Sequence, residues 1–231
     1  MRLDKYLADM SIGTRSEVKK IINKGRVKVN DKIIKTADYQ VKDDDLVYFD
    51  EQLVSYIDYE YYILNKPAGY LTANYDKNDP VVMDLITSKR KDLSPVGRLD
   101  KDSEGLLLIT NDGKLNHELL SPNNHVLKKY YVRLDSELNP DADKILSKPI
   151  DLGDFITKPA IFEKIDDTSA YLTIAEGKFH QVKRMFSYLG NEVTYLKRVE
   201  FKNLKLDGLK VGEYRQLTKE ELTELKSNEV Y

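Results

Sequence analysis

The carboxylate best placed for chemistry lies in the stretch from Val96 to Gly113, which reads VGRLDKDSEGLLLITNDG. Asp100 directly follows an Arg-Leu pair in this stretch. The apolar run Leu106–Ile109 comes a few residues later and predicts a buried strand. An acid that lies just before a buried strand is therefore the first candidate for a catalytic group.

The same stretch allows two other interpretations. Asp100, Asp102 and Glu104 are spaced like the first ligands of an EF-hand loop. The twelfth position of such a loop needs a bidentate Glu but is Asn111 here, and the predicted flanks are strands instead of helices. Calcium binding is therefore disfavoured. A solvent-exposed acidic turn closed by Gly105 remains an open alternative.

Two further segments carry residues suited to contacts with an anion or an aromatic ring. Lys66 lies in the turn NKPAGY, where a lysine beside Pro and Gly could hold a phosphate. The predicted strand KKYYV, residues 128–132, places tyrosines beside lysines. Such tyrosines serve either ordinary packing or base stacking.

The segment EGKFHQVKRMF, residues 176–186, predicts a helix with two distinct faces. The spacing i, i+3, i+4, i+7 defines a buried stripe of Val182, Met185, Phe186 and Leu189. A second face carries His180, Lys183 and Arg184. These three residues form either a solvated basic surface or a group of cations directed at a carboxylate or a phosphate.

Composition limits the possible chemistry. The 231 residues include no cysteine, which excludes a disulfide framework, a thiolate metal site and a Cys nucleophile. The three histidines show no HExxH spacing, so we expect no metal. Hydrophobic content of 41% and charged content of 33% fit a globular protein. We find no apolar stretch of membrane-spanning length and no signal-peptide pattern, and therefore expect a cytoplasmic protein.

Residues 1–55 predict a small independent unit of two helices and short strands. Thr14 and Glu17 form a capping-box pattern at the start of the second helix. Between Thr14 and Lys35 stand eight Lys or Arg against two acids, although the whole chain has a net charge of −2. These cations continue from the helix into the next strand, which favours an RNA-backbone surface. The predicted RNA-binding residues are Arg15, Lys19, Lys20, Lys24, Arg26 and Lys28.

The remainder predicts a second domain at 61–231, after a linker at 56–60. Strands and helices mix without a regular βαβ repeat, so we predict an α+β fold. Expected strands lie at 61–64, 106–109, 130–134, 170–174 and 199–206. Expected helices lie at 81–86, 114–120, 142–146, 179–189 and 219–225.

Taken together, GRLDKDSEGLLLITNDG, NKPAGY, KKYYV and EGKFHQVKRMF resemble the motifs of the RsuA-type pseudouridine synthases of small-subunit rRNA. The N-terminal segments RLDKYLA and TRSEVKKIINKGRVKVNDKII resemble the S4 RNA-binding domain. TKPA at 157–160 and GEYRQLT at 212–218 also fit the family. The resemblance covers essentially the whole chain. LTAN after NKPAGY, and KDSEG after Asp100, depart from the commoner family residues.

The resemblance implies an S4 domain followed by a mixed, mainly antiparallel sheet flanked by helices. It implies isomerisation of a uridine in 16S rRNA, uridine 516 in this family, to pseudouridine without a cofactor. The expected partner is 16S rRNA or a partly assembled small ribosomal subunit, and we expect a monomer. An enzyme for large-subunit rRNA, or a non-catalytic RNA-binding assembly factor, stays open as an alternative.

The resemblance also implies roles for individual residues. Asp100 corresponds to the catalytic carboxylate, which acts as a nucleophile or removes a ribose proton. Tyr130 corresponds to the tyrosine that stacks on the target uracil and takes part in proton transfer. Lys183 corresponds to the basic residue that pairs with the catalytic acid. The expected substrate-binding residues are Arg98, Leu99, Lys66, His180 and Arg184.

Overall fold

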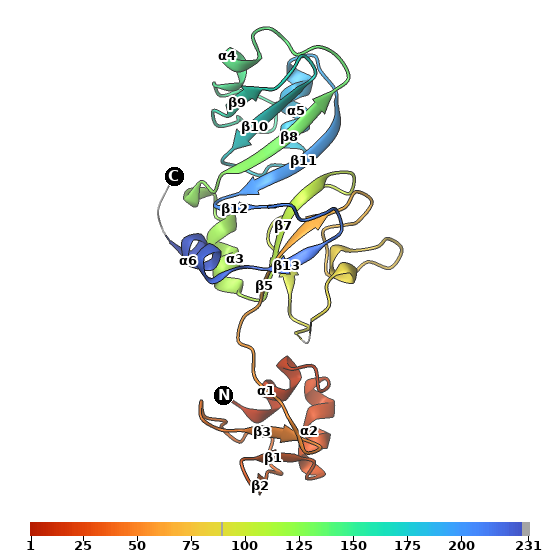
Figure 1. Ribbon diagram of the computed structural model, residues 1–231, viewed down its shortest axis with the longest axis vertical. Coiled ribbons are helices and arrows are strands. Elements are labelled where there is room, and N and C mark those ends of the chain that lie inside the picture. Colours follow the sequence, from red (N-terminus) through yellow and green to blue (C-terminus); the bar gives the residue numbers. More distant parts are fainter. Residues whose placement is uncertain (89, 228–231) are drawn as a thin grey trace. The chain divides into compact units, whose positions relative to one another are not determined.

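The computed structural model describes residues 1–88 and 90–227, which pack as two compact units (Figure 1). Unit 1 consists of Met1–Glu60 and Thr87–Leu93, and unit 2 contains Tyr61–Ile86 and the chain from Ser94 onward. The last residues of the predicted second domain, 228–231, lie outside the described residues. None of the helices in the described part has the length and apolar character needed to cross a bilayer.

Unit 1 combines two helices with a four-stranded sheet of order β2-β1-β3-β4. Its elements are α1 (Leu3–Asp9), α2 (Arg15–Asn23), β1 (Val27–Val29), β2 (Lys32–Ile33), β3 (Val47–Phe49) and β4 (Gln52–Leu53). The predicted capping box starts α2, because the Thr14 side chain accepts from Glu17 N while Thr14 N donates 2.8 Å to the Glu17 carboxylate. Apolar residues of both helices and of β1 and β3 form one buried core.

A second segment of the chain, Thr87–Leu93, returns to unit 1, which the sequence did not predict. Arg90 is 5% exposed, donates to Ile57 O at 2.9 Å and lies over the ring of Tyr56. Tyr56 also donates a 2.8 Å hydrogen bond to Asp9. The stretch predicted as a linker, 56–60, therefore makes ordered contacts within unit 1.

Unit 2 is built on one large sheet of order β13-β5-β7-β11-β8-β10-β9, with β6 paired to β7 and β12 to β11. The strands are β5 (Tyr61–Lys66), β6 (Ser94–Pro95), β7 (Glu104–Thr110), β8 (Lys128–Leu134), β9 (Ile161–Lys164), β10 (Ser169–Ile174), β11 (Val193–Phe201), β12 (Leu204–Lys205) and β13 (Tyr214–Gln216). Among the described strands β7 and β11 run parallel, and the other pairings are antiparallel. This mixed, mainly antiparallel sheet confirms the α+β prediction.

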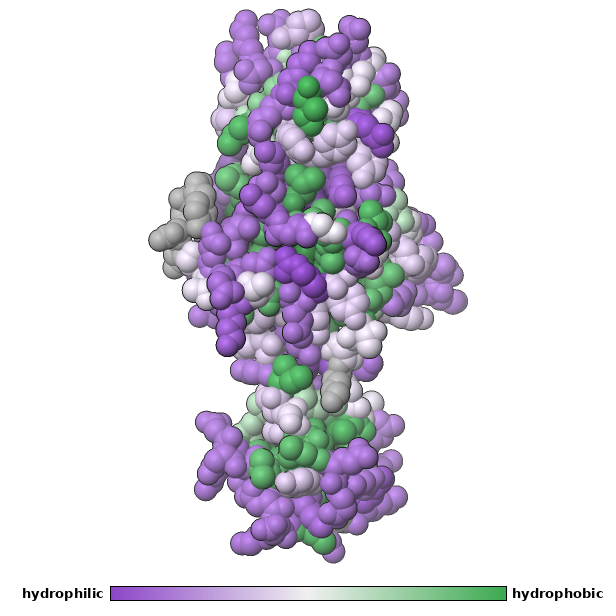
Figure 2. Space-filling view, in the orientation of Figure 1, coloured by the Kyte–Doolittle hydropathy of each residue, from purple (hydrophilic) through white to green (hydrophobic). Residues whose placement is uncertain are grey.

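The helices of unit 2 pack on this sheet at separate places. They are η1 (Val82–Leu85), α3 (Gly113–Leu120), η2 (Pro122–Asn124), α4 (Ala142–Leu146), α5 (Gln181–Tyr188) and α6 (Lys219–Lys226). One apolar cluster joins α3 and α6 to β5 and β7, through residues such as Leu115, Leu225, Ile63 and Leu108. Figure 1 shows α5 behind β8 and β11. On the face seen in Figure 2, hydrophilic side chains predominate and apolar ones gather in small patches.

Helix α5 starts two residues later than predicted. His180 adopts a left-handed backbone conformation, with φ of 50° and ψ of 28°, and therefore precedes the helix. The predicted stripe is confirmed, since the residues at this spacing are at most 8% exposed; they are Val182, Met185, Phe186 and Leu189. Burial of this stripe fixes which side chains the helix presents on its other face.

Candidate active site

The loop that carries Asp100 connects β6 to β7 and is fixed by a buried lysine. Lys66, at the end of β5, is fully buried and donates to Asp100 O at 3.0 Å, Ser103 O at 2.7 Å and Pro67 O at 3.0 Å. Burial lowers the pKa of Lys66 to about 8. The ammonium of Lys66 is enclosed by backbone carbonyls and positions the loop, so these contacts do not support its predicted role in binding substrate.

The first residues of the loop are fixed by Thr72. Its hydroxyl donates to Leu99 O at 2.7 Å and accepts from Leu99 N at 3.2 Å. The Leu99 side chain is 6% exposed, so this predicted substrate-binding residue is mainly a core residue. Gly69 N donates to Lys101 O at 2.7 Å, which ties the loop to the NKPAGY turn.

The end of the loop passes very close to β11 at Gly105. This residue has a φ of +107°, and a Cβ atom there would lie 2.2 Å from Arg198 O and 2.7 Å from Arg198 N. Only glycine fits such a backbone approach. Gly105 therefore brings the Asp100 loop next to the strand that follows α5 in sequence.

Asp100 faces two nitrogen atoms contributed by the start of α5. Its Oδ2 lies 3.5 Å from His180 Nε2 and 3.7 Å from Lys183 Nζ. Lys183 Nζ is closer to Asp102, donating to its two carboxylate oxygens at 2.8 and 2.7 Å. This hydrogen bond lowers the pKa of the Asp102 carboxyl. The structure thus brings Asp100, His180 and Lys183 together and adds Asp102, to which the sequence assigned no chemistry.

These charged residues surround a pocket of about 550 Å³. It is lined by Ala68, Gly69, Asp100, Lys101, Asp102, His180 and Lys183. Because NKPAGY supplies two of these residues and the GRLD loop supplies three, the pocket joins motifs that are far apart in the sequence. Among the described residues, His, Asp and Glu side chains do not gather into a group of three able to hold a metal ion.

Two other predicted site residues lie away from this pocket lining. Tyr130 is on β8, paired with Arg198 of β11 and Leu172 of β10, and is 7% exposed. Arg98 is exposed on the loop before Asp100. The pocket lining contains neither residue, so the stacking of Tyr130 on the target uracil and the binding of substrate by Arg98 remain predictions.

Arg184 is directed to a different loop from the one that carries Asp100. Its guanidinium forms an ion pair with Asp154, donates to Leu152 O at 2.7 Å and lies 4.9 Å from the ring centre of Phe155. The prediction that Arg184 binds substrate is therefore not supported by its contacts. A neighbouring carboxylate already neutralises this cation.

The predicted RNA-binding residues of unit 1 fall into two groups. Four are exposed on or just after α2, namely Arg15, Lys19, Lys20 and Lys24. The other two face acids of the β3–β4 turn: Arg26 forms an ion pair with Asp50, and Lys28 Nζ lies 2.6 Å from a Glu51 oxygen. Because those carboxylates would repel a phosphate, the α2 residues are the better candidates for RNA contact.

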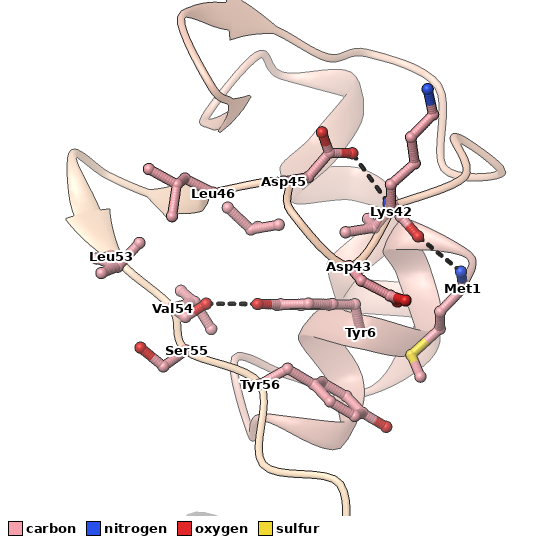
Figure 3. A pocket seen from close by; sticks show the side chains of 12 residues that line it. Met1, Tyr6, Lys42, Asp43, Asp45, Leu46, Leu53, Val54, Ser55 and Tyr56 are labelled. Carbon is pink, nitrogen blue, oxygen red and sulfur yellow. Dashed lines mark hydrogen bonds between the residues drawn. The ribbon is translucent and has the colours of Figure 1, made fainter.

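Unit 1 also contains a cavity of about 360 Å³, shown in Figure 3. Tyr6 crosses it and donates to Val54 O at 2.7 Å, and the N-terminal amino group donates to Val41 O at 2.8 Å. Asp43 and Asp45 are among the residues that line it. Lys42 and the N-terminal ammonium also line it, so the lining has no excess of cations, whereas the exposed face of α2 does.

Comparison with known proteins places this geometry in a family. A family model of RNA pseudouridylate synthase matches residues 60–188, and an S4 domain model matches residues 1–47. An uncharacterized RNA pseudouridine synthase of Bacillus subtilis is 45% identical, with 96% of this chain and 97% of the relative covered. A crystal structure of a pseudouridylate synthase has a TM-score of 0.69 at 37% identity, covering 97% of this chain and 99% of that one.

Two further relatives carry a more specific name. Ribosomal small subunit pseudouridine synthase A of Haemophilus influenzae is 39% identical, covering 97% of this chain and 99% of the relative. Its namesake in Escherichia coli is 37% identical, covering 96% and 98%. The chain therefore belongs to the RNA pseudouridine synthase family and carries an S4 domain at its N-terminal end. It is an isomerase that converts uridine in RNA to pseudouridine, as the motifs predicted.

Proposed function

We propose that this enzyme forms one pseudouridine in 16S rRNA, at the position of uridine 516 in the family, with Asp100 as its catalytic carboxylate. The observation that carries the proposal is the pocket in which Asp100 faces His180 and Lys183. Relatives named ribosomal small subunit pseudouridine synthase A, similar over nearly the whole chain, support the choice of RNA.

The reaction moves a base on its own ribose. The bond between N1 of uracil and C1′ breaks, the uracil turns, and C5 forms a new bond to C1′. C5 then loses its proton and N1 gains one, so substrate and product have the same atoms and oxidation state. The target base has to leave the RNA stack before it can enter the pocket.

Asp100 has two possible roles in this sequence of steps. As a nucleophile, its carboxylate would attack C1′ while uracil departs, and C5 would later displace it. As a base, it would remove the C2′ proton as uracil departs, which leaves a glycal; C5 would then bond to C1′ as the proton returns to C2′. Both routes need a carboxylate beside the ribose. Asp100 is that carboxylate in the proposal, and the hydrogen bonds from Lys66 fix the loop that carries it.

The remaining roles rest on the family motif. Lys183 stabilises the acidic loop through its contacts with Asp102 and Asp100. Tyr130 contacts the flipped uracil, and Arg98 holds the displaced nucleotide. Exposed cations on and just after α2 in unit 1 bind the RNA backbone; they are Arg15, Lys19, Lys20 and Lys24.

The deciding experiment maps pseudouridines in rRNA from cells that lack the protein, by a base-specific chemical stop assay. Loss of a small-subunit site that returns with the wild-type gene, but not with Asp100→Asn, supports the proposal. Loss of a large-subunit site would redirect the enzyme to that RNA. With no site lost, the proposed target is wrong. Purified enzyme given free 16S rRNA or partly assembled subunits then identifies the form of the substrate.

A further inference from the structure

Phe179 is the outer member of a two-ring stack beside the pocket. The rings of Phe179 and His180 are nearly parallel, with centroids 3.8 Å apart and an interplanar angle of 18°. Phe179 is 74% exposed, whereas the His180 side chain is 40% exposed. The imidazole therefore covers one face of the phenyl ring, and most of the remaining phenyl surface is open to solvent.

The turn that presents these rings is fixed by hydrogen bonds. His180 has a left-handed backbone, which residues other than glycine rarely adopt. Gln181, 3% exposed, supports this conformation: its N donates to Lys178 O, its Oε1 accepts from Lys178 N, and its Nε2 donates to Glu176 at 2.8 Å. A ring held by such a turn loses little conformational entropy when a ligand stacks on it.

The stack begins at the pocket, because one of its two rings belongs to the pocket lining. His180 lines the pocket, and its Nε2 is 3.5 Å from Asp100 Oδ2. Isolated exposed apolar side chains are ordinary on protein surfaces and need no explanation. Phe179 differs because its stacking partner joins it directly to the carboxylate proposed to act on the target nucleotide.

We infer that Phe179 and His180 form a stacking platform for a nucleobase next to the target uridine. This inference rests on the proposed function, because it requires a uridine extruded into the pocket. When a base is extruded, the bases beside it lose a stacking partner. An exposed aromatic ring stacked on a residue of the pocket lining can replace that partner, and it tolerates any sequence because every base has a flat π-face.

The test combines protein variants with abasic RNA. The substrate is a 16S rRNA fragment that the wild-type enzyme converts, with an abasic nucleotide placed in turn at each position flanking the target. Full-length Asp100→Asn protein, which prevents turnover during titration, is compared with the same protein carrying Phe179→Ala, Phe179→Leu or Phe179→Tyr. Dissociation constants are measured for every combination.

We expect Phe179→Ala to weaken binding of intact RNA by about tenfold or more, the usual effect of removing one ring–base stack. Phe179→Tyr should retain affinity, whereas Phe179→Leu, apolar but not planar, should lose most of it. At one flanking position, the abasic RNA and Phe179→Ala should give no further loss when combined. Tyr188→Ala, which removes a ring that is 60% exposed on α5, serves as the matched control and should have no effect.

The inference is overturned if Phe179→Leu binds as well as wild type, or if the losses add at every flanking position. Conversion of the unmodified fragment by wild-type enzyme is measured in parallel. If conversion occurs and the losses add, only the platform is wrong. If wild-type enzyme converts no uridine of 16S rRNA, the proposed target fails and the platform fails with it.

Discussion

Lys66→Met tests whether the buried lysine positions the Asp100 loop. Methionine has a similar length and fits an apolar site, but it cannot donate to the carbonyls that Lys66 now contacts. Asp100 O and Lys101 O keep other donors, Ser103 N and Gly69 N. Within the described residues, Pro67 O and Ser103 O would lose the donor that the structure gives them. The variant thus releases the loop at Ser103, after Asp100, and the neighbouring NKPAGY turn at Pro67.

The magnitudes predict a folded protein with impaired chemistry. Two carbonyls without donors, buried at Ser103 and part-buried at Pro67, cost at most about 2 to 6 kcal/mol in total, at roughly 1 to 3 each. Removal of an ammonium whose pKa falls from 10.5 to about 8 recovers about 3 kcal/mol. The net change in unfolding free energy is therefore at most about 3 kcal/mol. A shift of the catalytic group by about 1 Å costs about a hundredfold in rate, so we expect kcat to fall by that factor.

The assay compares kcat for pseudouridine formation with urea unfolding curves of the same preparations. Lys128→Met is the matched control, because Lys128 is also buried, also has a pKa lowered to about 8, and donates to Val126 O at 2.8 Å, away from the loop. It should leave kcat unchanged. The reasoning is refuted if Lys66→Met retains wild-type kcat, or if both variants lose activity equally.

The other predictions concern pH, catalysis, RNA binding and backbone fit. The pKa of Lys66 is about 8 in the folded state and 10.5 in the unfolded state, so the unfolded state binds the extra proton between these pH values. The unfolding free energy of the wild type should therefore rise by about 3 kcal/mol relative to that of Lys66→Met from pH 8 to 10.5, and urea unfolding that shows the same pH dependence for both proteins would contradict this. Asp100→Asn should abolish pseudouridine formation while leaving RNA affinity within about twofold, and residual conversion would exclude Asp100. Replacement of Arg15, Lys19 and Lys20, three exposed cations of α2, by Ala should weaken RNA binding and reduce its dependence on salt concentration. An unchanged salt dependence would show that this surface does not bind RNA. Gly105→Ala should lower the unfolding free energy, measured by urea unfolding, by about 3 kcal/mol or more, because the new Cβ atom would collide with the Arg198 backbone. A variant as stable as the wild type would show that β7 and β11 can move apart at this position.

Local patterns predicted the local structure well. The T-x-x-E pattern at Thr14 gave the capping box of α2, and the spacing from Val182 to Leu189 gave the buried stripe of α5. Both features depend on neighbours within one or two helical turns, which a sequence displays directly. The run Leu106–Ile109 likewise gave β7, because four consecutive buried residues leave few other structures.

Contacts between distant segments could not be predicted in the same way. No pattern in NKPAGY indicates that Lys66 is buried under carbonyls 34 to 37 residues later. The sequence shows that residue 184 is a basic Arg but not whether its partner is substrate or Asp154. Only the fold shows that the partner is Asp154. The parallel pairing of β7 with β11 joins segments about 90 residues apart, and Gly105 acquires its role only from that approach.

Lys183 shows most clearly how the fold refines a motif. The family resemblance paired it with Asp100, but its ammonium is bound by both oxygens of Asp102 and lies 3.7 Å from Asp100 Oδ2. A carboxylate that attacks a sugar carbon has to part from its counter-ion, and a loosely shared cation is easier to leave than a bidentate one. Because Asp102 anchors Lys183, the cation stays near Asp100 at the longer distance of 3.7 Å, while Asp100 lines the pocket. In the proposed mechanism, two acids spaced i, i+2 thus have different roles: Asp102 fixes the cation, and Asp100 acts on the substrate.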